Sequence, residues 1–198
     1  MSLNNDKRDR ILDAAVSVFA DRGFFQSRVS DIADAAGVAG GTIYLYFKSK
    51  DDVLISLFED RMDKIIRRVQ ARLSEEPSSK GKLRIFIEQH LSMVQQHPDL
   101  AEVLIVELRQ SSKFMREYRP TKFAEYLDVI ESIIRTGIET HEFRDGVSPR
   151  LAKRLIFGAL EEVSATWLGF RREGVKTPFN LEEAAEEITQ VLGTGFIR

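Results

Sequence analysis

The 198-residue sequence contains no cysteine, only five prolines and twelve glycines, and no long apolar run. Without cysteine, the chain cannot form a disulfide framework or a thiolate metal site. No stretch approaches the roughly 18 to 20 apolar residues that span a bilayer, and the N-terminal residues lack the apolar core of a signal peptide. We therefore expect a cytoplasmic protein with no part in the membrane.

The sequence also lacks a large excess of positive or negative charge, since it has 29 Lys and Arg and 31 Asp and Glu, which gives a net charge of −2. The first 50 residues carry seven basic and six acidic side chains, a net +1. A nucleic-acid partner would therefore have to be bound through the local placement of a few basic residues rather than through bulk charge. The 43% share of hydrophobic residues suits a folded globular protein.

Signals for catalysis are absent as well. The sequence has neither the glycine pattern of a nucleophile elbow nor a phosphate-binding loop. The three histidines, His90, His97 and His141, lack the spacing of metal ligands. We expect no enzyme activity, no catalytic or metal-binding residue and no cofactor.

Apolar residues recur at spacings of three and four almost throughout, which is typical of amphipathic helices, and no stretch looks like a strand. We expect an all-α fold. Ser27, Ser49, Ser148 and Asn180 are the expected N-caps of four helices, and Gly23 is the expected end of the first. The predicted helices cover residues 7–22, 27–35, 41–47, 49–74, 80–96, 98–111, 119–140, 149–171 and 181–196.

Residues 32–50, IADAAGVAGGTIYLYFKSK, predict two short helices joined at Gly37 by a tight turn. This is the outline of a helix-turn-helix, which places its second helix in the major groove of DNA. Ile43 and Phe47 are four residues apart and should turn into the core. A single tyrosine or lysine here would more often be a core or solvated residue, but the combination favours DNA binding. The side chains expected to bind phosphates or base edges are Arg28, Ser30, Thr42, Tyr44, Tyr46, Lys48 and Lys50.

Residues 8–55 resemble the DNA-binding domain of the TetR family of bacterial repressors. The resemblance is carried by Arg10–Ala15, Phe19-Ala20, Gly23-Phe24, Val29, Ile32-Ala33, Ala36–Val38 and the string GTIYLYFKSKDDV at residues 41–53. It implies an all-helical homodimer that binds a palindromic operator and dissociates from it when a small ligand binds to the C-terminal domain. Gly40 departs from the family pattern, in which many relatives carry a larger polar residue near this position. We expect a helix-turn-helix DNA-binding domain at 1–50 and a ligand-binding and dimerisation domain at 51–198, connected by the helix at 51–74.

Three features of the C-terminal part bear on its ligand. It is rich in large aromatic side chains, residues 103–108 are apolar around most of a helix, and basic residues recur at positions 113, 116, 119 and 122. Each feature has an ordinary explanation in core packing, a helix end or a solvated face. Together they predict an apolar tunnel with a basic mouth, which suits an amphiphile with an anionic head such as an acyl-coenzyme A.

The segments Glu107–Ser111, Arg154–Gly158 and Thr166-Trp167, together with residues 41–58, are similar to the fatty-acid-degradation repressors of the TetR family, the FadR type. This resemblance implies a repressor of fatty acid degradation genes that leaves its operator when it binds long-chain acyl-CoA. A TetR-type repressor of a drug-efflux or other gene, responding to a different hydrophobic ligand, is the alternative. The candidate ligand-binding residues are Leu104, Glu107, Leu108, Arg109, Arg116, Phe123, Phe157 and Trp167.

The last two predicted helices, 149–171 and 181–196, are the expected dimer interface. Two such hairpins would form a four-helix bundle across a twofold axis. The apolar and small residues expected there are Leu151, Leu155, Ala159, Ala165, Leu181, Ala184, Ala185, Ile188 and Leu192.

Overall fold

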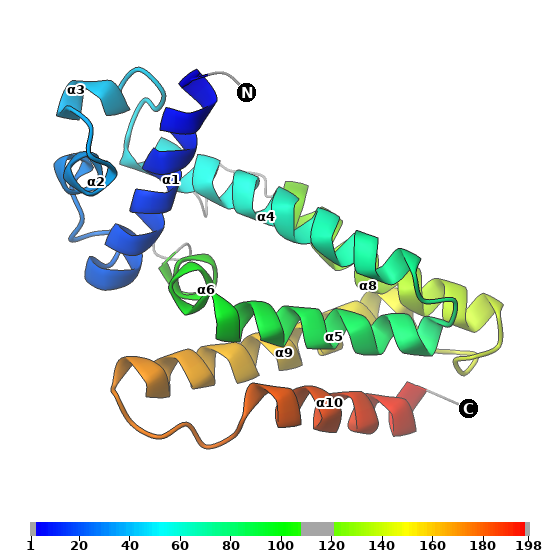
Figure 1. Ribbon diagram of the computed structural model, residues 1–198. Coiled ribbons are helices and arrows are strands. Elements are labelled where there is room, and N and C mark those ends of the chain that lie inside the picture. The colour runs from blue at the N-terminus through cyan, green and yellow to red at the C-terminus, as the bar shows by residue number, and fades with distance from the viewer. Residues whose placement is uncertain (1–2, 108–120, 197–198) are drawn as a thin grey trace. The chain divides into compact units, whose positions relative to one another are not determined.

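The computed structural model describes residues 3–107 and 121–196, and every regular element in these two ranges is a helix, which confirms the all-α fold (Figure 1). Among these residues, no helix combines the length and the apolar character that a membrane crossing requires. The helices are α1 (Leu3–Arg22), α2 (Val29–Ala36), α3 (Gly40–Ile43), α4 (Lys50–Ser74), α5 (Ser79–Gln96), α6 (Pro98–Ile105), α8 (Thr121–Glu139), α9 (Pro149–Arg172) and α10 (Leu181–Phe196).

Three of the predicted helix starts are confirmed by their hydrogen bonds. The Ser49 hydroxyl oxygen accepts from the N–H of Asp52 at 3.1 Å at the start of α4. The Ser148 hydroxyl accepts from Leu151 at 3.4 Å, and the Asn180 side chain accepts from Glu182 at 2.9 Å. These side chains satisfy backbone donors that have no partner inside the helix.

The prediction that Ser27 caps α2 is wrong. Its hydroxyl instead donates back to the carbonyl of Gly23 at 2.5 Å. The N-cap is Arg28, whose own N–H donates to Asp31 at 2.7 Å, so α2 begins at Val29. The carboxylate of Asp31, in the first turn of α2, thus accepts the backbone N–H of the N-cap residue, which a serine side chain at the cap would not have satisfied.

The chain divides into two compact units. The first comprises Met1–Arg61 and His97–Arg119, and the second comprises Met62–Gln96 and Pro120–Arg198. Helix α4 therefore contributes its first half to one unit and its second half to the other. The functional division at residue 50, expected from the sequence, stays a prediction.

In the first unit, α1 packs against α2 and α6, and α2 packs against α3. Phe19 and Ile32 are completely buried, and Ile43 and Phe47 are buried in the core as well, as the sequence predicts. Because α3 has only four residues, its fixed position depends on these apolar anchors and on the turn that leads into it from α2.

In the second unit, α5 lies against α8, α9 and α10, and α8 packs along α9 (Figure 1). Three residues expected at a dimer interface, Leu181, Ala184 and Ala185, are instead buried within the protomer, where α10 covers α5. Leu151 and Leu155 on α9 are 57% and 56% exposed. Val191 on α10 is 69% exposed, so exposed apolar residues lie on both α9 and α10.

Candidate nucleic-acid interface and effector domain

The two helices of the predicted helix-turn-helix are joined by a left-handed glycine. Gly37 has φ +64° and caps α2, with its N–H directed to the last carbonyls of that helix. Any other residue at this φ would be strained. The chain then enters α3 at Gly40 and continues through residues 44–47 as a turn, in which the Tyr46 N–H reaches the Ile43 carbonyl at 3.0 Å.

The prediction that the third helix reaches Phe47 is wrong, because α3 ends at Ile43. Leu45 and Tyr46 then donate to carbonyls three residues earlier, and Phe47 donates to the Ile43 carbonyl at 2.9 Å, so residues 44–47 form a tight turn. Tyr44 is 61% exposed in this turn, and Tyr46 is only partly exposed. Tyr44 thus presents its hydroxyl more fully than Tyr46.

The other predicted DNA contacts lie along the same short stretch of chain. Arg28, Ser30 and Lys48 are exposed, and Thr42 is partly exposed. The backbone at Gly40 and Gly41 has open space where a Cβ would stand. Hydroxyl and cationic groups placed in this way can bind phosphates, and their contact with DNA stays a prediction.

Lys50 has a different environment from the one expected. Its ammonium group donates to the carbonyls of Phe24 at 2.5 Å, Ser27 at 2.8 Å and Phe25 at 3.2 Å. It also stands 4.5 Å from the centre of the Phe24 ring. Partial burial lowers the pKa of Lys50, while Asp51 and Asp31 oppose that shift. An ammonium whose three donors are directed at carbonyls holds the α1–α2 turn and is not directed at phosphate.

Glu107 was expected among the ligand-binding residues, but its described partner lies beside the helix-turn-helix. The carboxyl Oε2 accepts from the backbone N–H of Phe24 at 2.6 Å, and the side chain is only 2% exposed. Glu107 follows the end of α6 and belongs to the same unit as α1 and α2. Leu104, also expected to bind ligand, lies in α6 of this unit and is partly exposed.

The second unit contains a cluster of aromatic side chains that includes two predicted ligand residues. Phe123 of α8 and Phe157 of α9 meet edge to face, with ring centres 5.1 Å apart. Phe157 also contacts Tyr126 and His90, at 6.4 Å and 6.0 Å between ring centres. Trp167, the third predicted residue in this unit, lies farther along α9 and is partly exposed.

A buried chain of hydrogen bonds runs through this aromatic cluster, and no pattern in the sequence indicated it. The Ser164 hydroxyl donates to the Leu160 carbonyl at 2.7 Å, so its oxygen is left to accept from His90 Nε2 at 3.5 Å. His90 Nδ1 then accepts from the Tyr126 hydroxyl at 2.9 Å. Burial lowers the pKa of His90 to about 4 and raises the pKa of Tyr126. Both groups are therefore neutral near pH 7.

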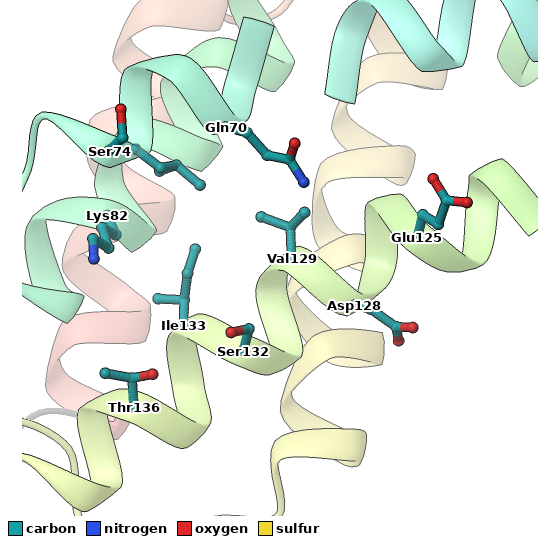
Figure 2. A pocket seen from close by; sticks show the side chains of 10 residues that line it. Gln70, Ser74, Lys82, Glu125, Asp128, Val129, Ser132, Ile133 and Thr136 are labelled. Carbon is teal, nitrogen blue, oxygen red and sulfur yellow. The ribbon is translucent and has the colours of Figure 1, made fainter. Parts of the chain in front are cut away.

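A pocket of about 480 Å³ lies between α4, α5 and α8 of the second unit (Figure 2). Its volume is in the range of small-molecule sites. Leu73, Val129 and Ile133 provide its apolar surface, and Figure 2 shows the polar groups of Gln70 and Ser132 nearby. The sequence could not have predicted this pocket, because its lining combines α4 and α5 with α8, which is far from them along the chain.

An ion pair connects α4 and α8 within this unit. Lys122, the last of the basic residues predicted at a ligand mouth, donates to Glu125 at 2.8 Å and lies 3.2 Å from Asp63 of α4. Hydrogen bonds from Lys122 to Glu125 and then to Asp63 raise the pKa of its ammonium group. The remaining residues expected at that mouth or in the ligand site, Leu108, Arg109, Lys113, Arg116 and Arg119, lie outside the described residues.

Comparison with known proteins matches two family models to consecutive parts of the chain. A family model described as bacterial regulatory proteins of the tetR family matches residues 11–57. A second model, described as the C-terminal region of YsiA-like proteins, matches residues 58–195, well over half of the chain. The fatty acid metabolism regulator protein of Bacillus subtilis is 42% identical over 168 residues, which cover 85% of this chain and 87% of that regulator.

Two solved structures are similar over nearly the whole chain. One is the transcriptional regulator FadR from Bacillus subtilis in complex with stearoyl-CoA, with a TM-score of 0.86 and 38% identity over 94% of this chain and 97% of FadR. The other is the fatty acid degradation regulator FadR from Bacillus halodurans, with a TM-score of 0.87 and 36% identity over 94% of each chain. The protein therefore belongs to the TetR family of bacterial transcription regulators.

Proposed function

We propose that the protein is a homodimeric repressor that binds a palindromic operator of fatty acid degradation genes and releases it when long-chain acyl-CoA binds. The observation that carries this proposal is the similarity to FadR in complex with stearoyl-CoA, at 38% identity and a TM-score of 0.86 over 94% of the chain. A match of that extent includes both the helix-turn-helix and the helices that would hold an effector.

The first unit supports operator binding. Tyr44, Ser30, Arg28 and Lys48 present hydroxyl or cationic groups to solvent around α2 and α3. Such groups bind phosphates and fix the register of a recognition element on the duplex. The weak net charge makes each of these contacts a large share of the total electrostatic attraction.

The second unit supports binding of a long apolar ligand. Phe123, Phe157 and Tyr126 form an aromatic cluster between α8 and α9. The pocket beside α8 adds apolar surface from Leu73 and Ile133 together with polar groups at its edge. An acyl chain needs apolar walls, whereas the thioester and phosphates of coenzyme A need polar partners.

Exposed apolar residues on α9 support dimer formation. Leu151 and Leu155 stand one helical turn apart and are each more than half exposed. Gly158, the next residue on that side, leaves space where a Cβ would be. Two such helices can approach closely across a twofold axis, and a dimer places two recognition elements about 34 to 36 Å apart for successive major grooves.

The proposal is tested in two steps with purified protein. An operator is first selected from random-sequence duplexes, and its affinity is measured by fluorescence anisotropy. Stearoyl-CoA, octanoyl-CoA and free coenzyme A are then titrated into the complex. We expect release with stearoyl-CoA and not with free coenzyme A. Trp167 is the sole tryptophan, so its fluorescence reports ligand binding to the second unit without DNA present.

Tyr44→Phe serves as a matched variant for the DNA half, since it removes only the exposed hydroxyl. It should weaken operator binding and leave the stearoyl-CoA affinity unchanged. If stearoyl-CoA leaves the operator complex intact while a cationic dye or another hydrophobic compound dissociates it, the protein is a TetR-type regulator of a different gene class.

A further inference from the structure

The turn between α1 and α2, residues 23–27, is held from two sides by side chains that are distant in the sequence. From one side, Lys50 at the start of α4 donates to the carbonyls of Phe24, Phe25 and Ser27. From the other, Glu107 accepts the N–H of Phe24 at 2.6 Å. Phe24 thus has its N–H held by Glu107 and its carbonyl held by Lys50.

This turn determines where the DNA-binding helices lie. Gly23 ends α1 in a left-handed conformation with φ +77°, and α2 begins only six residues later at Val29. The Phe24 ring is 4% exposed and meets Phe19 of α1 edge to face at 5.5 Å. Since α3 packs on α2, a change in the turn would move the recognition residues relative to α1.

The Glu107 contact is water-excluded and closely fitted. The side chain is 2% exposed, and a Cβ added to Gly23 would stand 3.3 Å from its carboxyl oxygen. Helix α6, which precedes Glu107, packs against α1. A buried hydrogen bond of this kind is costly to break, because water cannot replace the lost partner.

We propose that Glu107 is a positioning residue that couples effector binding to operator binding, by holding the Phe24 amide and with it the α1–α2 turn. The inference rests on the proposed function. Residues 108–120 connect Glu107 directly to Thr121 at the start of α8, the helix that carries Phe123 and Tyr126. Effector binding that moves Glu107 away from the Phe24 amide weakens the hold on the turn.

A small movement is sufficient for such a switch. A hydrogen bond of 2.6 Å is lost once the two atoms separate by about 1 Å more, since contacts near 3.6 Å no longer count as hydrogen bonds. The effector has to favour the released arrangement for this to happen, and operator DNA then opposes effector binding to the same extent. In this proposal Glu107 acts on operator binding through Phe24.

The experiment compares wild-type protein with Glu107→Leu, which removes the acceptor, and Glu107→Gln, which keeps an acceptor oxygen without the charge. For each, the operator Kd is measured with and without stearoyl-CoA, and the stearoyl-CoA Kd is measured without DNA. We expect the ratio of operator affinities without and with stearoyl-CoA to fall by about tenfold in Glu107→Leu. The stearoyl-CoA affinity without DNA should be unchanged or up to about tenfold higher, because the effector no longer has to break the hold on the turn. Glu107→Gln should lie between wild type and Glu107→Leu.

Tyr44→Phe is the control for weakened DNA binding without loss of coupling, and its ratio of operator affinities without and with stearoyl-CoA should equal that of wild type. If Glu107→Leu keeps the wild-type ratio, Glu107 has only a structural role. If Glu107→Leu no longer binds stearoyl-CoA, Glu107 is a ligand contact. Either result overturns the proposal. A wild-type protein that ignores stearoyl-CoA would instead overturn the proposed function, and the two failures are thereby distinct.

A second measurement needs no variant. Amide hydrogen exchange of Phe24 in the wild-type protein should accelerate by about tenfold or more when stearoyl-CoA binds, because its N–H loses a buried acceptor. The Phe47 amide, which is bonded to Ile43 within the same unit at 2.9 Å, provides the internal reference and should change little. Unchanged exchange at Phe24 with saturating effector would contradict the coupling role of Glu107.

Discussion

Replacing Lys50 separates two roles that a basic residue next to a recognition helix can have. A phosphate contact would make operator binding less dependent on salt when it is removed, by about 0.9 units of slope per protomer in a plot of log K against log salt. The hydrogen bonds from Lys50 to Phe24, Phe25 and Ser27 predict another result for Lys50→Met. The slope should stay unchanged, and both stability and operator affinity should fall.

The expected loss of stability follows from the acceptors that the variant leaves behind. A hydrogen bond from a charged donor contributes about 1.5 to 3 kcal/mol, but solvent can partly replace it at a half-buried site. Of the three carbonyls, that of Phe25 belongs to an exposed residue and at 3.2 Å is the most distant. We therefore expect a loss of about 2 to 3 kcal/mol in total, well below the sum of three full bonds.

The assay is fluorescence anisotropy with the selected operator between about 50 and 200 mM salt, together with urea unfolding. Lys48→Met is the matched control, since Lys48 is exposed and lies two residues earlier. It should flatten the slope and leave the free energy of unfolding unchanged. If Lys50→Met flattens the slope as much as Lys48→Met and unfolds at the wild-type urea concentration, Lys50 is a phosphate contact and its support of the α1–α2 turn is refuted.

Three further outcomes are expected in the second unit. Below pH 6.5 His90 is protonated in the unfolded chain, whereas in the folded chain it stays neutral down to about pH 4. The free energy of unfolding should therefore decrease as pH falls from 6.5 to 4. Urea unfolding should show a decrease of up to about 3 kcal/mol relative to His90→Gln. Gly137→Ala should lower the free energy of unfolding by about 1 to 3 kcal/mol, because its Cβ would overlap the buried Phe143 ring. Replacing both Leu151 and Leu155 by Glu should convert the dimer to a monomer in analytical ultracentrifugation, with unchanged circular dichroism; a persisting dimer would move the interface away from α9.

Periodicity and capping residues predicted most of the fold. The starts of α4, α9 and α10 were recognisable because a polar side chain beside the first turn satisfies a free backbone donor. The start of α2 was placed too early at Ser27, since Asp31 takes over the capping role there. These are local interactions within four residues, which a sequence can reveal.

The candidate sites depend on contacts that no local pattern records. Phe123 and Phe157 could be proposed from their size, but their meeting with His90 and Tyr126 depends on how three helices pack. A histidine on an apolar face gives no indication of its partner until the neighbouring helices are placed. The pocket beside α8 has the same origin, so its lining could be found only in the folded chain.

Lys50 and Glu107 illustrate why charged residues near a functional segment are difficult to interpret from sequence. Each was assigned to an external ligand, DNA for one and an effector for the other, and each instead has a described partner in the backbone of Phe24. The Lys50 ammonium group donates to the Phe24 carbonyl, and the Glu107 carboxylate accepts from the Phe24 N–H. Both hydrogen bonds restrain the same residue, so we expect the effects of the two substitutions not to be independent. A turn held in this way responds to displacement of either α4 or α6, which makes residues 23–27 the point where both helices act on the recognition element.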